Sequence, residues 1–277
     1  MIIGRRSEQK VGEPVSLRRA LGLTQSSRKK RDTKAGPCEE ERMIVPKLYD
    51  VVYIVKESRY NEELRYSLRS VCENFPVRNV WIFGYCPMWL KEIIHVKIPQ
   101  KGDKWSNSKM LFDKIAHCES LPDEFVLFND DFFVTAKVDK VEQWYDGLLQ
   151  DRIDFLKEKF GNTYPLYATQ LQQVADRLKE HGIENAKNYA VHKPMLFDRK
   201  KLIKSLELTK DLPMSLRSFY ANYYNVGGID APDTKVFTAG DFVMSYPYMS
   251  SDDRSFSIGH IGKSIRGMFP NKCKYEI

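Results

Sequence analysis

The 277-residue sequence contains no run of about 18 uninterrupted apolar residues, the minimum that a membrane-spanning helix requires. Its first residues also lack the apolar core of a secretory signal. The five cysteines are widely spaced and form no paired motif, which argues against a zinc site and against a disulfide framework. These absences predict a cytoplasmic protein with reduced thiols and no membrane span.

A uniform charge excess is also absent, because the net charge of +7 is concentrated at one end of the chain. Residues 1–42 hold 11 Lys and Arg against 6 Asp and Glu, whereas the remaining residues hold 33 against 31. The N-terminal segment, with its basic run at 28–31, shows no sustained periodicity. We therefore expect residues 1–42 to be disordered and residues 43–277 to form a single domain. The alternative from another functional class is a nucleic-acid-binding module that uses the basic tail.

The sequence does contain the pattern of an α/β fold. Residues 50–55, 79–84 and 125–128 are apolar and rich in β-branched and aromatic residues, which predicts buried strands. Helical spacing of apolar residues at 61–74 and 109–117 separates these strands. Alternating strands and helices predict a mostly parallel central sheet flanked by helices.

The second half of the chain is predicted to add helices around this sheet. The sequence turns helical over residues 140–181, and further helices are expected near 199–206 and 215–224. Residues 236–249 have the character of strand and loop. An acidic pair at 252–253 is expected to lie in a turn.

Two adjacent acids and an amide follow the third predicted strand. Asn129, Asp130 and Asp131 lie between apolar rings, at the carboxyl end of a strand where parallel sheets bind ligands. A divalent cation such as Mg²⁺ or Mn²⁺ is held by one or two carboxylates while substrate phosphates complete its shell. This stretch therefore suits a nucleotide diphosphate bound through a metal, although a polar turn has the same composition.

The helix predicted at 61–74 carries a second group of polar residues. Asn61 is expected to cap it, and Arg65 and Arg69 share one face, where two guanidinium groups can grip phosphate. Periodicity alone equally fits a solvated surface helix. His192, which precedes Lys193 and a proline, is by itself more typical of a structural histidine than of a catalytic one.

Several segments, in order along the chain, resemble regions of the Stealth family of hexose-1-phosphate transferases. The matching segments are residues 61–70, 77–82 with 87–90, 128–132, 192–199 and 216–219. The resemblance implies a GT-A-like fold, in which a nucleotide-sugar donor binds across the strand ends. Residues 53–57 depart from the family, whose first strand ends in a tryptophan, an acid or amide and a glycine.

The resemblance also implies roles for individual residues. Glu63 and His192 are candidate catalytic bases, and Asp131 is both catalytic and, with Asp130, metal-binding. Donor or phosphate binding falls to Arg65, Arg69, Asn129 and Arg217.

The predicted activity is therefore transfer of a hexose-1-phosphate from a nucleotide sugar to an acceptor hydroxyl. Because the first region departs from the family, a GT-A glycosyltransferase that makes a glycosidic bond is the alternative. Its acceptor would be a polysaccharide or a modified nucleic acid. For a transferase of this kind, nucleic acid is expected only as an acceptor.

Overall fold

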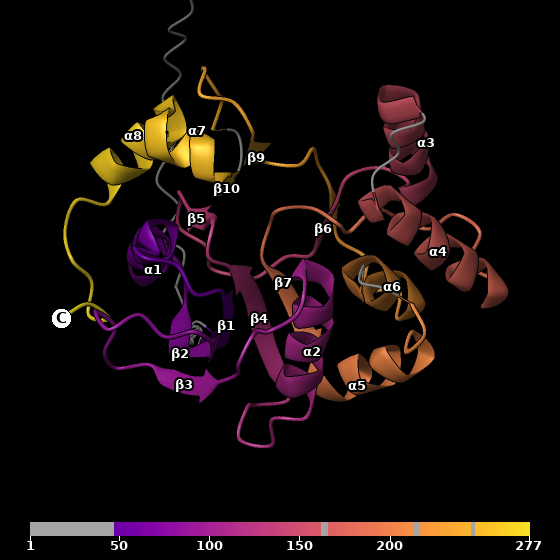
Figure 1. Cartoon of the computed structure of the whole chain (residues 1–277), viewed down its shortest axis with the longest axis horizontal. Helices are drawn as coiled ribbons and strands as arrows, with labels where there is room; N and C mark the ends of the chain where they lie inside the picture. The colour runs from indigo at the N-terminus through magenta and orange to yellow at the C-terminus, as the bar shows by residue number, and fades with distance from the viewer. Residues whose placement is uncertain (1–46, 162–165, 213–215, 245–246) are drawn as a thin grey trace, which may run out of the picture. The chain divides into compact units, whose positions relative to one another are not determined.

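A computed structural model describes residues 47–161, 166–212, 216–244 and 247–277, all within the unit formed by residues 45–277. The segment 1–42 lies outside the described residues. The central sheet has the strand order β3-β2-β1-β4-β7 (Figure 1). Its strands β1 to β4 are parallel, and β7 pairs antiparallel with β4. Their bounds are β1 (Tyr49–Val55), β2 (Val77–Gly84), β3 (Ile94–Lys97), β4 (Glu124–Asn129) and β7 (Met195–Asp198).

Strands β1 and β4 are buried on both faces, which explains their continuous apolar sequence. In β1, Val51 and Tyr53 face one hydrophobic cluster and Val52 faces the other. In β4, Phe128 and Phe125 divide in the same way between the two clusters. Successive side chains of a strand point to opposite faces, so helices must cover both sides of this sheet.

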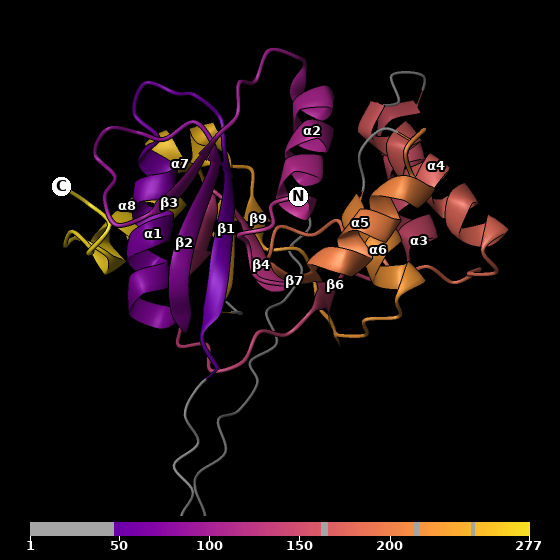
Figure 2. The same cartoon turned by 90° about the horizontal axis from the view of Figure 1, so that it is seen from below.

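Two helices provide the cover, one on each face of the sheet. Figure 2 shows α1 (Glu62–Asn74) on one side of the strands and α2 (Lys104–Ala116) on the other. Helix α1 buries Leu64, Leu68 and Val71, which lie along one stripe of the helix. It ends at the extended residue before Pro76, because a proline disfavours helical backbone in the residue that precedes it.

The order of these elements creates a topological switch point between β1 and β4. The chain leaves β1 through α1 toward β2, and it returns from β3 through α2 to β4 on the opposite face. Connections that depart to opposite faces leave a crevice at the carboxyl ends of the two strands, where α/β sheets bind ligands.

A smaller sheet extends the chain beyond this crevice. Strand β5 (Phe132–Val134) follows β4 almost directly and pairs antiparallel with β10 (Tyr248–Ser251). On its other side, β10 pairs parallel with β9 (Lys235–Val236). Helices α7 (Asp253–Ile258) and α8 (His260–Met268) share a hydrophobic cluster with this sheet. The small sheet therefore brings two distant segments, β9 and β10, to the end of β4.

The remaining helices form the predicted additions of the second half. Helices α3 and α4 pack together with α6 around a separate apolar cluster, and α5 packs against α2 and α6. A two-stranded sheet of β6 and β8 lies in the connections. The bounds are β6 (Trp144–Tyr145), α3 (Leu149–Phe160), α4 (Leu166–Glu180), α5 (Arg199–Leu208), α6 (Leu216–Tyr223) and β8 (Ile229–Asp230).

The predicted mostly parallel sheet with flanking helices is confirmed, and three local predictions are wrong. Asn61 precedes α1, but its side chain makes no capping bond and instead donates to the Lys56 carbonyl. Helix α2 begins at Lys104 rather than at 109, because the Asp103 side chain accepts from the amides of Trp105 and Ser106. Residues 140–148 are not helical and contain β6. The predicted helix at 215–224 corresponds to α6, although its first residue lies outside the described part.

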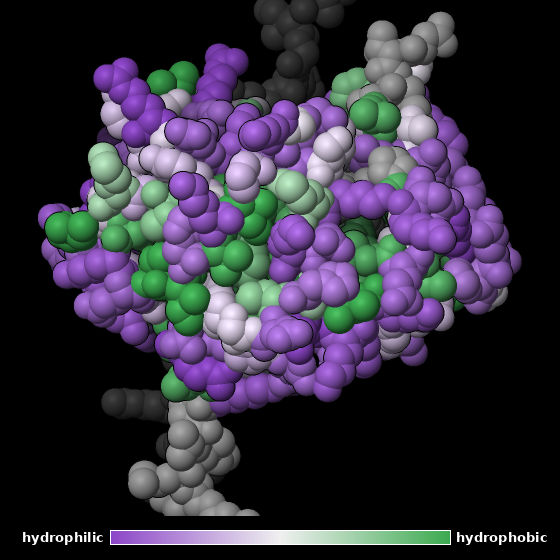
Figure 3. All heavy atoms as spheres, turned by 60° about the horizontal axis from the view of Figure 1, so that its bottom comes forward, coloured by the Kyte–Doolittle hydropathy of each residue, from purple (hydrophilic) through white to green (hydrophobic). Residues whose placement is uncertain are grey.

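The surface agrees with the absence of long apolar runs in the sequence. None of the described helices has the length and apolar character needed to cross a membrane. On the face seen in Figure 3, hydrophilic side chains surround small apolar patches.

Candidate active site at the end of β4

The predicted acids lie at the switch point. Asn129 is the last residue of β4, and Asp130 and Asp131 form the turn into β5. The rings of Phe128 and Phe132 on either side are fully buried and anchor this turn to the core. The apolar residues that made the stretch conspicuous in the sequence thus fix the position of the two carboxyl groups.

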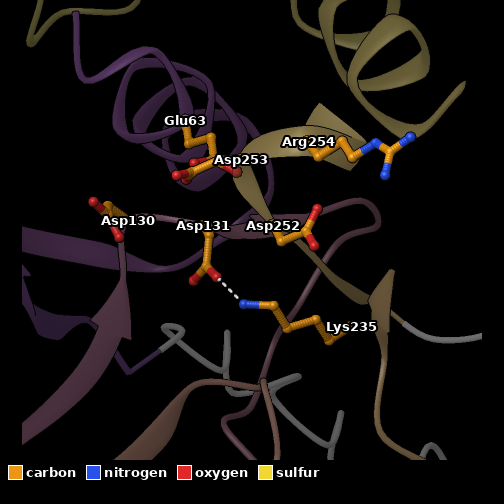
Figure 4. A pocket seen from close by; sticks show the side chains of 7 residues that line it. All are labelled: Glu63, Asp130, Asp131, Lys235, Asp252, Asp253 and Arg254. Carbon is orange, nitrogen blue, oxygen red and sulfur yellow. Dashed lines mark hydrogen bonds and ion pairs between the residues drawn. The ribbon is translucent and has the colours of Figure 1, made fainter. Parts of the chain in front are cut away.

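A cavity of about 400 Å³ opens beside this turn (Figure 4). Its walls come from α1, the end of β4, β9 and the start of α7. Five carboxylates and two cations line it, which leaves a formal charge of −3 when all are ionised. The lining residues are Glu63, Asp130, Asp131, Lys235, Asp252, Asp253 and Arg254.

Glu63 projects from the first turn of α1 into the cavity. Its Oε1 accepts a hydrogen bond from the Ser251 hydroxyl at 2.6 Å. Burial raises the pKa of Glu63 to about 7, the charges of Asp131, Asp130 and Asp253 add to the rise, and the Ser251 bond opposes it. A carboxyl group that titrates near neutrality can both accept and donate a proton under physiological conditions.

Asp130 has a similar electrostatic environment. Burial raises the pKa of Asp130 to about 7, with a further contribution from the neighbouring charge of Asp131. The positive charge of Lys235 opposes this rise. Buried acids of like charge favour a cation or a proton between them, so this end of the sheet attracts positive charge.

Asp131 is paired on one side only. Its Oδ2 accepts from Lys235 Nζ at 2.7 Å, whereas its Oδ1 is buried without a hydrogen-bond partner. An unpaired carboxylate oxygen beside a second carboxylate is a suitable partial ligand set for a hard divalent cation. Among the described residues no three His, Cys, Asp or Glu side chains form a metal site. Phosphate and water oxygens would therefore have to complete the shell.

His192 is held by an aspartate that the sequence did not point to. Its Nδ1 lies 2.6 Å from Asp233 Oδ2, and its backbone amide donates to Asp233 Oδ1 at 2.7 Å. Burial raises the pKa of Asp233, but the bonds and charge of His192 outweigh it and hold the pKa below its ordinary value. An ionised acceptor at Nδ1 places the proton there and leaves Nε2 as the basic nitrogen.

The imidazole lies next to the acidic cavity rather than in its wall. Its ring is nearly perpendicular to those of Phe132, which follows Asp131, and of Phe237, at centroid distances of 6.3 and 6.2 Å. The ammonium of Lys235 lies 5.7 Å from the Phe237 ring. The rings of Phe132 and Phe237 therefore lie between His192 and the residues Asp131 and Lys235 of the cavity.

Arg217 lies between these two groups but is engaged with the backbone. Its guanidinium donates to the carbonyls of Val191 and Lys193, at 2.6 and 2.8 Å. Burial lowers the pKa of Arg217, and the charges of Asp233 and Asp131 oppose this. Its observed contacts fix the segment that carries His192; a phosphate clamp stays a prediction.

Arg65 and Arg69 of α1 contact Glu276 rather than the acids that line the cavity. Arg69 donates from Nε and Nη2 to both carboxylate oxygens of Glu276, at 2.6 and 2.9 Å, and from Nη1 to two backbone carbonyls. Arg65 lies over the Trp89 ring and contacts Glu276 at 3.3 Å. The structure therefore does not support phosphate binding by Arg69, because four of its five N–H donors hold the C-terminal segment.

Several residues around the cavity were not predicted as functional. Lys235 and Asp233 belong to or flank very short strands, whose sequence has no detectable period. Asp252 was expected in a turn, yet it caps α7: it accepts from the Ser255 amide, and Ser255 Oγ accepts from the Asp252 amide. The usual capping-box signature has Glu or Gln three residues after the cap, whereas this chain has Ser255, so the sequence signal for this helix is weak.

Comparison with known proteins gives only distant likenesses. No family model and no curated protein matches the chain. One similar structure is the galactosyltransferase LgtC in complex with donor and acceptor sugar analogues, which is 13% identical with a TM-score of 0.44. The match covers 81% of this chain and 98% of the LgtC chain. The glycosyltransferase GlyE of Streptococcus pneumoniae is 12% identical over 68% of this chain and 46% of its own, with a TM-score of 0.32. At these values the likeness assigns no function, and the chemistry rests on the residues of the site.

Proposed function

We propose that the chain is a metal-assisted transferase that moves a sugar from a nucleotide-sugar donor to an acceptor hydroxyl. The observation that carries the proposal is the position of Asp130 and Asp131 at the switch point between β1 and β4. There Asp131 lines a cavity of about 400 Å³, and its buried Oδ1 has no hydrogen-bond partner. A site of this kind, at strand ends and with an unsatisfied acid, suits a ligand that brings both phosphate and a cation.

Asp130 and Asp131 would hold the cation, Mg²⁺ or Mn²⁺. When bound, it would neutralise the charge that develops on the departing diphosphate. The excess of carboxylates over cations in the cavity makes such a counter-charge necessary, because phosphates would otherwise be repelled. Glu63 would then keep its proton less readily, and its Ser251 bond would hold it in place.

We infer that His192 is the general base toward the acceptor. Its Nε2 would take the hydroxyl proton while Asp233 stabilises the imidazolium through Nδ1. The acceptor oxygen then bonds to the anomeric carbon. The bond from that carbon to the phosphate oxygen breaks, and its electron pair leaves with the nucleoside diphosphate.

The finer alternative is transfer of hexose-1-phosphate, in which the acceptor oxygen attacks the β-phosphorus. The resemblance of residues 61–70 and 128–132 to the Stealth family favours it, and Glu63, Asp130 and Asp131 from those segments line one cavity. However, the engagement of Arg69 with Glu276 removes one cation expected near the transferred phosphate. Sugar transfer alone is therefore the function that the geometry supports best.

Incubation with nucleotide sugars, Mn²⁺ and simple sugar acceptors, followed by phosphorus NMR, tests the proposal. Sugar transfer predicts release of nucleoside diphosphate and an acceptor product without phosphorus. A phosphodiester in the product, with release of nucleoside monophosphate, would establish the alternative. Absence of turnover across UDP-, GDP- and dTDP-sugars would contradict both.

A further inference from the structure

An ammonium group lies inside the acidic cavity and is bound to one of its acids. Lys235 and Asp131 each keep only 14% of their side-chain surface exposed, and their charged atoms are 2.7 Å apart. Arg254, the other cation of the cavity wall, is exposed, and its guanidinium points away from the acids in Figure 4. Of the two cations that line the cavity, Lys235 is therefore the one in direct contact with its acids.

The small sheet builds this contact from its backbone outward. Ser250 of β10 lies opposite Lys235 on one side and opposite Phe132, the residue after Asp131, on the other. The ion pair therefore bridges β9 and the turn before β5 across strand β10. Both β9 and β5 are hydrogen-bonded to β10. A lysine on a mobile surface segment would not be fixed in this way, so its position beside Asp131 is a property of the fold.

The position of this ammonium conflicts with the binding of a cation at Asp131. A divalent ion and an ammonium compete for the same negative charge, and taking two charges out of water is costly unless each is paired. If a divalent cation binds Asp131, the partly buried ammonium of Lys235 loses its ion-pair partner. A diphosphate entering the cavity would supply a new anionic partner for it.

We propose that Lys235 is an internal counter-ion that holds Asp131 when no donor is bound and releases it to a divalent cation when a diphosphate arrives. This inference rests on the proposed function. Its consequence is that the cation binds weakly alone and tightly with the nucleotide. By linkage the cation must raise the affinity for the nucleotide by the same factor as the nucleotide raises the affinity for the cation. Part of that factor depends on Lys235.

The test measures Mn²⁺ affinity from the electron paramagnetic resonance of free Mn²⁺, with and without UDP, GDP or CDP. Lys235→Met should bind Mn²⁺ alone about tenfold more tightly than the wild type, which corresponds to about 1.4 kcal/mol. The gain in Mn²⁺ affinity from the nucleoside diphosphate should fall by a similar factor. Lys235→Arg keeps the charge and should behave like the wild type.

Arg254→Met is the matched control, because it removes one positive charge from the same cavity without touching Asp131. It should change Mn²⁺ affinity much less than Lys235→Met does. Equal effects would overturn the proposal, because the net charge of the cavity would then explain both variants. Unchanged affinity in Lys235→Met would also overturn it. Lys235→Gln, with folding checked by thermal unfolding, replaces the Met variant if that one does not fold. No Mn²⁺ binding by any variant with any nucleotide would instead contradict the proposed function itself.

Discussion

Replacing Glu63 by glutamine should stabilise the protein at alkaline pH. The carboxyl group ionises with an ordinary pKa of 4.5 in the unfolded chain, whereas burial and the charges of Asp131, Asp130 and Asp253 raise the pKa in the fold to about 7. Between these values the folded state holds a proton that the unfolded state has lost. The stability from this proton is fully present below about pH 4.5 and is lost as the pH rises through 7.

The magnitude follows from the difference in pKa. Each pKa unit is worth about 1.4 kcal/mol, so the difference between 4.5 and about 7 amounts to roughly 3 kcal/mol above pH 8. This is an upper value, because Glu63 and Asp130 titrate in the same range and share one electrostatic environment. Glutamine cannot ionise, and its carbonyl can still accept the Ser251 hydrogen bond.

Urea unfolding in EDTA at pH 5 and pH 8.5 measures the effect. Glu63→Gln should match the wild type at pH 5 within about 1 kcal/mol and exceed it by about 2–3 kcal/mol at pH 8.5. Glu62→Gln is the control on the same helix: the hydrogen bond from Arg266 lowers the pKa of Glu62, although burial opposes it, so this variant should lose stability above pH 5. A Glu63→Gln variant that is no more stable than the wild type at pH 8.5 would refute the electrostatic reasoning.

The other predictions concern catalysis and the C-terminal segment. His192→Ala should slow transfer by roughly 10²- to 10⁴-fold with little change in donor affinity, as measured by initial rates and calorimetry, and an unchanged rate would move the role of base to Glu63. Arg69→Lys should lower the thermal midpoint because it loses the paired contact with Glu276, while the folded variant keeps its turnover; a large loss of turnover at full stability would return Arg69 to phosphate binding. Deleting residues 1–42 should leave transfer to sugar acceptors intact, whereas loss of most salt-sensitive nucleic-acid affinity would favour the binding-module alternative.

The parts of the fold that the sequence predicts are those with strong local patterns. Strands β1 and β4 are continuous apolar runs because both faces of the sheet are covered, and α1 shows its buried stripe at Leu64, Leu68 and Val71. Parallel topology then brings the end of β4 close to the start of α1. For this reason Glu63 and Asp131, 68 positions apart, line one cavity.

The contacts that the sequence does not predict are made across long separations by side chains with several possible partners. An arginine on an exposed-looking helix face suits phosphate or a carboxylate equally, and only the fold brings Glu276, 207 positions away, to Arg69. Lys235 reaches Asp131 across 104 positions through a strand of two residues. Such short strands carry no period, so neither the lysine nor its partner is apparent before the sheets assemble.

The measurement closest to the central claim is nucleotide release from nucleotide sugars by the wild type and by an Asp130→Asn, Asp131→Asn double variant. The wild type should release nucleotide with Mn²⁺ and stop in EDTA, and the folded double variant should be inactive under both conditions. Release that continues in EDTA, or that survives in the double variant, would contradict the assignment of these two carboxylates to a metal-assisted donor site.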